Sequence, residues 1–553
     1  MTFKRLDDGI SVSPQLSLGD VGRAAREGFR AIVCNRPDAE ETGQPDAATI
    51  RAEVERHGLA FAHIPITSGK TDAAEADAMA QALATLPKPI LAYCRSGARS
   101  TTLWALANAD TSDPVSLVRQ AAGAGYDIAA LEPQLQSRRK AQNMTYDVVI
   151  VGGGAAGIAT ASSILKRNAK VTIAIVDPAK DHDYQPGWTM VGAGVFTPGQ
   201  TRRAEAEVMP AGVAWMQVAA SGFDPDRNAV ELADGRILTY RVLVAAPGLR
   251  LAWEKIAGLE QALGKNGVTS NYRFDLAPYT YRLVKQVKTG RALFSQPAMP
   301  IKCAGAPQKA MYLSCDIWRE AGVLPAIEVE FHSAGAVLFA VAPYVPALME
   351  YVEKYGIDLQ LESNLVAVDG DRRIATFEGK KDGETRQIQR AFDMLHVVPP
   401  QVSHDVVAKS ALAAASGFVE VDEATLRHKR YDNVFGLGDG AGTSNAKTAA
   451  AARKQAPVVA VNVLAALDGK PPVADYDGYG SCPLTVERGK IVLAEFGYGG
   501  KLLPSFPSWV IDGTRPTRAA WFLKERILPS LYWNAMLKGH ELMAKPHQVG
   551  AAT

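Results

Sequence analysis

The chain has 553 residues, of which 47% are hydrophobic and 21% are charged, which is enough for roughly three or four globular domains. Its formal net charge of +2 gives no sign of the basic composition that nucleic-acid binding needs. Five cysteines in a chain this long exclude a disulfide scaffold and indicate a reducing compartment, where cysteine chemistry is catalytic. The first sixteen residues lack the apolar core of a signal peptide, and no run of 18 apolar residues predicts a spanning helix.

The N-terminal part alternates strand-like and helix-like segments, which predicts a small α/β domain over residues 1–126. A charged and polar run at 127–144 predicts a linker. The segments expected to be strands are 29–34, 59–66 and 90–93, and those expected to be helices are 47–57, 74–86 and 100–109.

Cys94 heads the loop YCRSGARS directly after a predicted strand, as in sites that hold an anion over a thiolate. Tyrosine phosphatases place an arginine six positions after the cysteine, whereas Arg99 here follows by five. The shorter loop makes a smaller ring of N–H donors, which suits the terminal sulfur of a persulfide better than a phosphate. We therefore expect a sulfurtransferase site, with a phosphatase, or a cysteine with incidental arginines, as the alternatives.

A second unit begins with a dinucleotide-binding fingerprint in its full context. An apolar strand at 146–151 leads into a glycine-rich turn and a helix, and a second strand ends at an acid. The glycines let the backbone approach a diphosphate, which the N-terminus of the helix attracts, and the acid binds ribose hydroxyls. The predicted cofactor-binding residues are Gly152, Gly154, Gly157 and Asp177.

A downstream motif distinguishes a flavin from a nicotinamide cofactor. Residues 434–440 read VFGLGDG, which resembles the second flavin motif of proteins with two dinucleotide-binding domains. That resemblance implies that Gly438 and Asp439 bind FAD, with the carboxylate on the ribityl chain. The strand and turn at 329–336 lack a glycine triplet, so no second fingerprint for NAD(P)H is seen.

Two loop cysteines, Cys303 in IKCAGAPQK and Cys482 in YGSCPLT, are flanked by glycine and proline. Lys302 precedes Cys303 and would favour its thiolate. From spacing alone these cysteines could equally be inert and half-buried, since most cysteines are. Cys315 is expected to be structural.

From residue 144 to about residue 540 the chain resembles the sulfide:quinone oxidoreductases of mitochondria and proteobacteria. The resemblance rests on VVIVGGGAAGIATA, HDYQPGWTMVGAG, IKCAGAPQKAMYL, FGLGDGAGTSNAKTAAAA and YDGYGSCPLT. It implies a Rossmann-type α/β flavoprotein with FAD over 145–510 and a redox pair made of Cys303 and Cys482. Where related sequences often carry a cysteine after Gly-Asp, this chain has Gly440, which fits a two-cysteine mechanism.

The resemblance also implies how the reaction runs. Hydrosulfide attacks a disulfide or trisulfide bridge, Cys482 keeps the persulfide, and Cys303 passes electrons through FAD to a ubiquinone-type quinone. Lys447 is expected near the flavin or the quinone. The sulfur acceptor is a thiol such as glutathione, or sulfite, or Cys94 in cis. No metal site is expected, and a homodimer is compatible with the sequence.

The C-terminal region 511–553 is expected to contain amphipathic helices that rest on a membrane surface. Apolar residues recur at helical spacing over 519–538 with Lys524, Arg526 and Lys538 among them, and Pro529 divides the stretch. The alternative is that this apolar stripe packs on the core. With a membrane quinone, the expectation is a peripheral protein on the cytoplasmic face of a bacterial inner membrane.

The N-terminal segment, including residues 10–16 and 35–38, resembles a small family with a phosphatase-like fold, the β-lactamase hydrolase-like proteins. Two other functions for the whole chain stay open. One is an NADH-type flavoprotein dehydrogenase, against which the missing second glycine motif counts. The other is a flavin-based sulfide or redox sensor with a phosphatase-like N-terminal domain.

Overall fold

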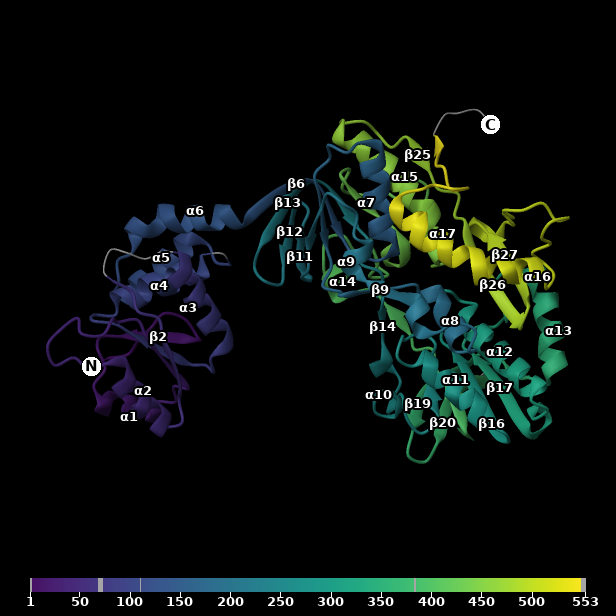
Figure 1. Cartoon of the computed structure of the whole chain (residues 1–553), viewed down its shortest axis with the longest axis horizontal. Coiled ribbons are helices and arrows are strands. Elements are labelled where there is room, and N and C mark those ends of the chain that lie inside the picture. Colours follow the sequence, from purple (N-terminus) through teal and green to yellow (C-terminus); the bar gives the residue numbers. More distant parts are fainter. Residues whose placement is uncertain (1, 68–72, 110, 382–383, 549–553) are drawn as a thin grey trace. The chain divides into compact units, whose positions relative to one another are not determined.

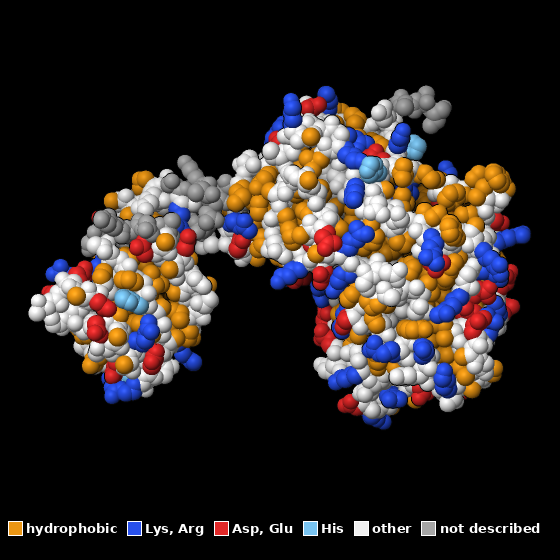
Figure 2. Space-filling model, in the orientation of Figure 1, with side chains coloured by type: hydrophobic (Ala, Val, Ile, Leu, Met, Phe, Trp, Pro, Cys, Tyr) orange, Lys and Arg blue, Asp and Glu red, His pale blue; other side chains and the backbone are white. Residues whose placement is uncertain are grey.

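A computed structural model describes residues 2–67, 73–109, 111–381 and 384–548. The chain divides into two compact units (Figure 1). The first comprises Met1–Met144 with Asp234–Ile237, and the second comprises Thr145–Ala233 with Leu238–Thr553. Figure 2 shows basic and acidic side chains interspersed over the visible face of both units, in keeping with the small net charge.

The first unit is a five-stranded sheet in the order β1-β2-β5-β3-β4, in which only β1 runs antiparallel to its neighbour. Helices cover the sheet, and β5 ends at the Cys94 loop, so the predicted α/β class is confirmed here. Its elements are β1 Lys4–Arg5, β2 Ile10–Ser13, α1 Leu18–Arg26, β3 Ala31–Cys34, α2 Ala47–Arg56, β4 Ala60–His63, α3 Ala73–Thr85, β5 Ile90–Tyr93, α4 Ala98–Asn108, α5 Pro114–Gly123 and α6 Glu132–Gln142.

Helix α6 occupies most of the stretch 127–144 for which a linker was expected. Its Leu135 is fully buried and packs in the same core as Leu103 and Trp104 of α4. The charged sequence did not predict this helix, which contacts the rest of the unit through the buried Leu135 and through an ion pair between Arg138 and Asp77. The first unit therefore extends to residue 144.

The second unit begins with a seven-stranded sheet in the order β10-β7-β6-β13-β12-β11, with β24 paired to β13. β6, β7 and β10 are parallel, and α7 and α15 pack together on this sheet around Ile158 and Val459. The elements are β6 Asn143–Val151, α7 Ala155–Arg167, β7 Ile173–Val176, β8 Asp181–Asp183, β9 Arg202–Ala204, α9 Glu205–Val208, β10 Val213–Met216, β11 Ala220–Asp224, β12 Ala229–Leu232, β13 Ile237–Ala245, β24 Val434–Gly436 and α15 Ala449–Leu467.

A second parallel sheet follows in the order β15-β22-β16-β17-β18, so the expected pair of Rossmann-type sheets is confirmed. A loop from β16 to α12 carries Cys303 where a second glycine motif would lie. The elements are α8 Trp188–Val191, α10 Leu259–Ala262, β15 Val268–Thr269, α11 Ala277–Gln286, β16 Gly290–Gln296, α12 Ala306–Glu320, β17 Ile327–Ser333, α13 Val345–Tyr355, β18 Asp358–Gln360, β19 Ser363–Asp369, β20 Ile374–Lys381, β21 Glu384–Ala391 and β22 Met394–His396.

The C-terminal part adds the hairpin β26 Gly480–Glu487 and β27 Lys490–Phe496, then α16 Arg518–Phe522, a π-helical turn Leu523–Ile527 and α17 Leu528–Asn534. The π-helical turn separates the two helices, and Pro529 lies in the first turn of α17. Among the described helices, none has the length and apolar character that a membrane-spanning segment requires.

The apolar stripe at 519–538 divides between two environments. Phe522 and Ile527 are 58% and 45% exposed. The later residues Tyr532, Trp533, Met536 and Leu537 are buried in the core beneath α7 and α15. The later part of the stripe thus packs on the core, as the alternative interpretation held. In the earlier part Ala520 is buried and Trp521 and Leu523 are partly buried, so the outward half of the stripe consists of Phe522 and Ile527.

Candidate active site

Cys303 and Cys482 come together in the second unit, although 179 positions separate them in the chain. Their sulfur atoms are 3.5 Å apart, with Cys303 in the loop before α12 and Cys482 on strand β26. A Cβ atom on Gly305 would lie 2.6 Å from the Cys482 sulfur, so only glycine permits this approach. The pair is close enough to exchange a proton in the reduced state and to form a bond on oxidation.

The Cys303 backbone has a φ of 49°, which is the left-handed conformation that residues with a side chain rarely adopt. Three contacts hold it there. The Cys303 N–H donates to the Lys447 carbonyl at 2.8 Å, and the Tyr272 hydroxyl donates to the carbonyl groups of Lys302 and Cys303. Strain kept by such anchors is typical of functional sites.

Two buried lysines face the cysteine pair. Lys309, in the second turn of α12, donates to the Cys303 sulfur at 3.1 Å. The hydrogen bond from the Cys482 thiol, together with the Lys309 ammonium, lowers the pKa of Cys303, while the same pairing raises the pKa of Cys482. Burial, aided by the charge of Lys309, lowers the pKa of Lys524 to about 7. Cys303 is thus the thiolate of the pair.

Lys302 was expected to favour the Cys303 thiolate, and its charge does interact with Cys303. Its ammonium donates to Gln185 at 2.6 Å, so the lysine hydrogen bond to the Cys303 sulfur comes from Lys309 instead. The roles of Lys309 and Lys524 were missed, although Lys309 stands six positions after Cys303 within the IKCAGAPQK motif.

Lys447 is 7% exposed, and its ammonium donates to the Ala441 carbonyl at 2.7 Å. Burial lowers the pKa of Lys447, and burial raises the pKa of Asp439 while Lys302 and Lys447 counteract that effect. Asp439 also senses the charge of Cys303. The second flavin motif and the cysteine loop therefore meet in one electrostatic environment.

The glycine-rich turn between β6 and α7 has the geometry of a diphosphate cradle. A Cβ on Gly152 would lie 2.1 Å from the Ala246 carbonyl, and one on Gly157 would lie 1.9 Å from the Gly152 carbonyl. Gly154 is the N-cap of α7 and offers no side-chain cap, so the first N–H groups of the helix have no side-chain acceptor at the cap. Asp177, at the end of β7, accepts from the Gly153 N–H at 2.5 Å. These residues fit a dinucleotide.

Gly438 and Asp439 form a short turn directly after β24. Gly438 has a φ of 70°, and its N–H donates to Gln455 on α15 at 2.8 Å. This bond fixes the turn so that Asp439 is held beside Lys302 and Lys447. Within the described parts of the chain, no cluster of three His, Cys, Asp or Glu residues could hold a metal ion.

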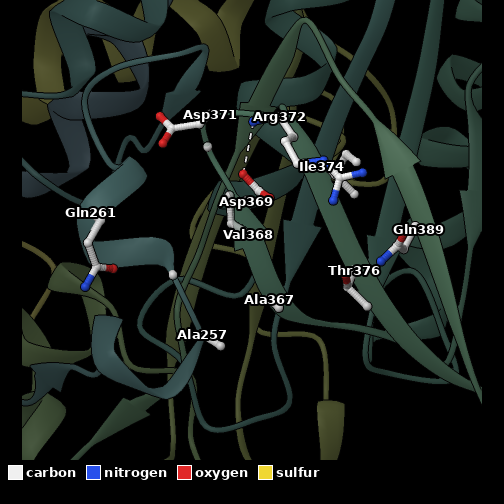
Figure 3. A pocket seen from close by; sticks show the side chains of 12 residues that line it. Ala257, Gln261, Ala367, Val368, Asp369, Asp371, Arg372, Ile374, Thr376 and Gln389 are labelled. Carbon is white, nitrogen blue, oxygen red and sulfur yellow. Dashed lines mark hydrogen bonds between the residues drawn. The ribbon is translucent and has the colours of Figure 1, made fainter.

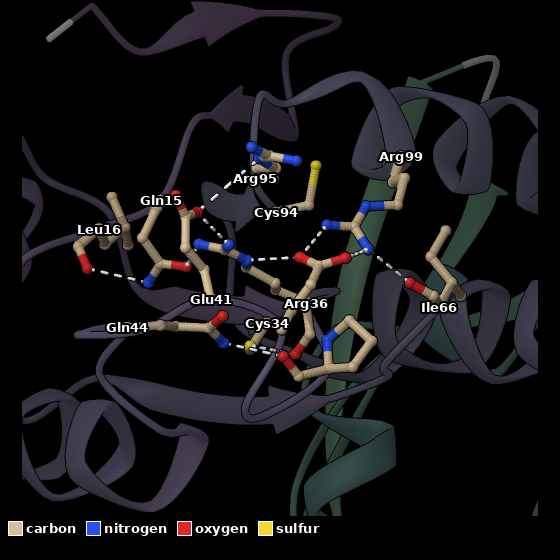
Figure 4. Close-up of polar contacts among 12 residues, drawn as sticks. Gln15, Leu16, Cys34, Arg36, Glu41, Gln44, Ile66, Cys94, Arg95 and Arg99 are labelled. Atoms are coloured by element: carbon tan, nitrogen blue, oxygen red, sulfur yellow. Dashed lines mark hydrogen bonds and ion pairs between the residues drawn. The ribbon is translucent and has the colours of Figure 1, made fainter. Parts of the chain in front are cut away.

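Cys94 forms a separate site in the first unit (Figure 4). The thiol is fully buried and accepts from the Gly97 N–H at 3.1 Å. Gly97 has a φ of 92° and is the N-cap of α4, again without a side-chain cap. The start of this helix is directed at the sulfur, as an anion-binding thiol site requires.

Arg99 on α4 is engaged by a carboxylate in this site. Its guanidinium makes two 2.7 Å bonds to Glu40 and one of 2.9 Å to the Ile66 carbonyl. Arg36 binds the same Glu40 at 2.6 Å. The hydrogen bond from Arg99 lowers the pKa of Glu40 to about 2, so this acid stays charged. Cys34, by contrast, donates to the Arg36 carbonyl and is packed.

A surface hollow of about 540 Å³ lies elsewhere on the second unit (Figure 3). Residues of β19, β20 and the α10 region line it, including Asp369, Asp371 and Arg372. None of the cysteines contributes to its lining, so it is not part of the sites above.

Two family models match the chain. The model described as "Beta-lactamase hydrolase-like protein, phosphatase-like domain" matches residues 2–111. The model described as "Pyridine nucleotide-disulphide oxidoreductase" matches residues 146–287. A β-lactamase hydrolase-like protein of Xylella fastidiosa is 32% identical over 106 residues, which are 19% of this chain and 25% of that protein.

The larger part of the chain matches full-length curated proteins. The mitochondrial sulfide:quinone oxidoreductase of Dictyostelium discoideum is 41% identical over 407 residues, which are 73% of this chain and 88% of the relative. That of Mus musculus is 38% identical, over 71% of this chain and 87% of the relative.

Solved structures agree on the fold. The sulfide:quinone oxidoreductase of Aquifex aeolicus, 17% identical, superposes with a TM-score of 0.60 over 72% of this chain and 92% of its own. A chain in the mitochondrial ATP synthase of Tetrahymena thermophila, 22% identical, gives 0.64 over 72% of this chain and 97% of its own.

Proposed function

The chain belongs to the sulfide:quinone oxidoreductase family, and from that membership we propose that Cys303 and Cys482 are the cysteines through which it oxidises sulfide. One observation carries this assignment. The two sulfur atoms lie 3.5 Å apart, and the Lys309 ammonium lies 3.1 Å from the Cys303 sulfur. A thiolate beside a second thiol, with a fixed cation, is what thiol–disulfide exchange requires.

In the oxidised state a bridge joins the two sulfur atoms. Where the bridge is a disulfide, hydrosulfide attacks the Cys482 sulfur, the S–S bond breaks, and Cys482 keeps a persulfide while Cys303 leaves as a thiolate. Where a third sulfur atom bridges the pair, the same attack leaves that sulfur atom on Cys303 as a persulfide anion. The lowered pKa of Cys303 supports its role as leaving group, because a more stable thiolate leaves faster. The bridge is a disulfide or a trisulfide, which intact mass spectrometry of the oxidised protein distinguishes by one sulfur atom.

An acceptor thiol then removes the outer sulfur of the persulfide, and Cys482 returns as a thiolate. When Cys303 and Cys482 rejoin, two electrons leave the pair. Lys309 and Lys524 balance the negative charge that the site carries at each of these stages. Glutathione, sulfite and Cys94 are the candidate acceptors.

The cofactor of this family is a flavin, and FAD is the form proposed here. Gly152, Gly154, Gly157 and Asp177 would hold its dinucleotide part, and Gly438 and Asp439 would face its ribityl chain. A flavin bound there supplies two-electron chemistry between the thiol pair and a quinone. Lys447, buried beside Asp439, would place a positive charge near that reaction.

The outward half of the C-terminal stripe is proposed to rest on a membrane surface, where a ubiquinone-type quinone dissolves. Phe522 and Ile527 on α16 and its π-helical turn are exposed, and Trp509 is 86% exposed. Apolar and aromatic side chains beside basic residues are typical of interfacial helices. With five free cysteines, the proposed location is the cytoplasmic face of a bacterial inner membrane.

For the first unit, the proposal is that Cys94 accepts or transfers sulfane sulfur. Within the first unit, residues 1–126 would carry the sulfurtransferase site, with 145–510 as the oxidoreductase and 511–553 as the membrane-associating part. The support is a buried thiol at a helix start, with Arg99 fixed by Glu40 beside it. The phosphatase-like family match keeps phosphate-ester hydrolysis as the competing activity.

The central test is anaerobic mixing of the protein with sulfide while the flavin absorbance is recorded, followed by a short-chain quinone. We expect bleaching that quinone reverses, and its loss in Cys303→Ser. Cys315→Ser is the matched control, because Cys315 is a buried thiol on α12 whose pKa burial raises. A flavin that stays oxidised with sulfide but bleaches with NADH would overturn the assignment.

The first unit is tested by transfer of sulfane sulfur from the sulfide-treated protein to glutathione. Cys94→Ser should slow the transfer, whereas Cys34→Ser, which removes a packed thiol of the same unit, should not. If Cys94→Ser leaves sulfur transfer unchanged and abolishes hydrolysis of an aryl phosphate, the first unit is a phosphatase.

A further inference from the structure

A buried chain of three polar side chains joins the C-terminal segment to the dinucleotide-binding region. His182 lies on β8, Glu205 begins α9, and Tyr532 lies on α17. Their exposed fractions are 3%, 2% and 5%. His182 Nδ1 lies 3.2 Å from Glu205 Oε2, and its Nε2 lies 2.7 Å from the Tyr532 hydroxyl. The redox chemistry described above uses none of them.

The partners determine which nitrogen of His182 carries the proton. The Glu205 carboxylate can only accept, so Nδ1–H donates to it, and Nε2 then accepts from the Tyr532 hydroxyl. Without that hydroxyl, Nε2 is a buried acceptor without a donor, and the ring loses the contact that holds it in place against Glu205. A shift of the ring takes the Nδ1–H donor away from the buried Glu205 carboxylate, which is costly enough to move it.

Glu205 lies directly against the glycine-rich turn. A Cβ on Gly153 would be 3.1 Å from Glu205 Oε1 and 2.9 Å from the Asp177 Cβ, so these two acids enclose Gly153. The Gly153 N–H in turn donates to Asp177 at 2.5 Å. A displacement of Glu205 therefore changes the packing of the residue at the centre of the cradle.

The same C-terminal segment also holds the helix that follows the cradle. Ser162 on α7 donates to the Leu537 carbonyl at 2.7 Å, and Arg167 binds Glu541 at 2.8 Å. A Cβ on Gly539 would lie 2.7 Å from the Ser162 carbonyl, so the segment is pressed against α7. These contacts ensure that Tyr532 is presented to His182 in one position.

We propose that Tyr532, acting through His182 and Glu205, is a positioning residue for the dinucleotide-binding turn, so that retention of the flavin depends on the docked C-terminal segment. The inference rests on the proposed function, because it presumes that the turn binds a flavin. It assigns to the C-terminal region a role in cofactor binding, separate from contact with a membrane.

The test is the rate of flavin release from the purified holoprotein, followed by the fluorescence of free flavin. Tyr532→Phe keeps the ring and removes only the hydroxyl, and we expect release to be about tenfold faster. Tyr312→Phe is the matched control, since it removes an equally buried hydroxyl that donates only to the Leu348 carbonyl at 3.1 Å. It should leave the release rate unchanged.

Two further measurements distinguish a positioning role of Tyr532 from a general effect on the stability of the protein. The thermal midpoints of the two apoproteins should fall by similar amounts, since each loses one buried hydrogen bond. Glu205→Gln should also speed release, and Tyr532→Phe combined with it should add less than the product of the single effects. Equal release from Tyr532→Phe and wild type would overturn the inference alone, whereas wild type that retains no flavin would overturn the proposed function as well.

Discussion

Around Cys303, each of three neighbours contributes a different part of the reactivity. Lys309 supplies a direct ammonium contact, Cys482 a thiol donor, and Lys524 a buried charge from the C-terminal segment. Cation and thiol both favour the Cys303 thiolate, which is the form that the proposed mechanism needs as leaving group. Lys524 differs from Lys309 because burial lowers its pKa to about 7, so its charge varies near neutral pH.

Replacing Lys524 with Met should therefore change Cys303 in a pH-dependent way. Below pH 7 Lys524 is charged and supports the thiolate, and above pH 7 it is neutral. We expect alkylation of Cys303 by iodoacetamide in the reduced protein to be roughly three- to tenfold slower in Lys524→Met at pH 6. The two proteins should converge above pH 8.

Peptide mass spectrometry of the alkylated cysteine provides the rate. Lys538→Met, which removes an exposed lysine of the same segment, is the control and should follow wild type. A ratio between Lys524→Met and wild type that is constant from pH 6 to pH 9 would contradict a titrating role for Lys524.

The sequence indicated the candidate reactive cysteines more reliably than the charged side chains that contact them in the structure. Cys303 and Cys482 were named from motifs, yet the contact between Lys309 and the Cys303 sulfur was not predicted, because proximity along the chain does not give side-chain direction. Lys524 could not be found this way, since contacts 42 positions beyond Cys482 depend on how the C-terminal helices pack. The Glu40 partner of Arg99 was missed for the same reason.

At the scale of elements, the β6–turn–α7 unit depends on glycine for close backbone approach. We expect Gly157→Ala to abolish flavin binding, because its Cβ would lie 1.9 Å from the Gly152 carbonyl and force the turn apart. The measurement is flavin content of the purified protein by absorbance. Gly199→Ala is the control, since no atom lies within 4 Å of its added Cβ. Full flavin content in Gly157→Ala would show that the turn relaxes.

The outward half of the C-terminal stripe predicts a second outcome. Replacing Phe522 and Ile527 together with Ser removes two exposed apolar side chains and should weaken co-sedimentation with lipid vesicles roughly tenfold or more. Val337→Ser, a change at a 57% exposed residue away from that stripe, should leave binding unchanged. Equal vesicle binding by the double variant would place the membrane contact elsewhere.

Helices and strands were predicted correctly where a local sequence pattern determines them, and were missed where contacts with distant parts of the chain determine them. The strand, turn and helix of the dinucleotide motif were predicted within a few residues, since glycines and an unbroken apolar strand determine them. Helix α6 was missed because its sequence is mostly polar, although its Leu135 is buried in the core of the first unit and its Arg138 pairs with Asp77. The buried half of the C-terminal stripe could not be told from the exposed half, because both share one periodicity.

At the scale of the whole molecule, the two units have separate hydrophobic cores. One core gathers β2, β5 and α4 of the first unit, and others lie wholly within the second. Units with independent cores unfold independently, so two calorimetric transitions are expected. A protein made of residues 145–553 should lose the smaller transition and keep sulfide-dependent bleaching within about twofold of the full chain. A single transition detected identically by all probes would contradict this.

The left-handed backbone at Cys303 lowers the stability of the fold, but it belongs to the residue whose thiol the proposed reaction needs. A glycine at that position would relieve the conformational cost, which is about 1 kcal/mol or more for a residue with a side chain, while removing the thiol. A stabilising substitution here would therefore abolish the proposed reaction. Efforts to engineer a heat-resistant form should leave this turn untouched.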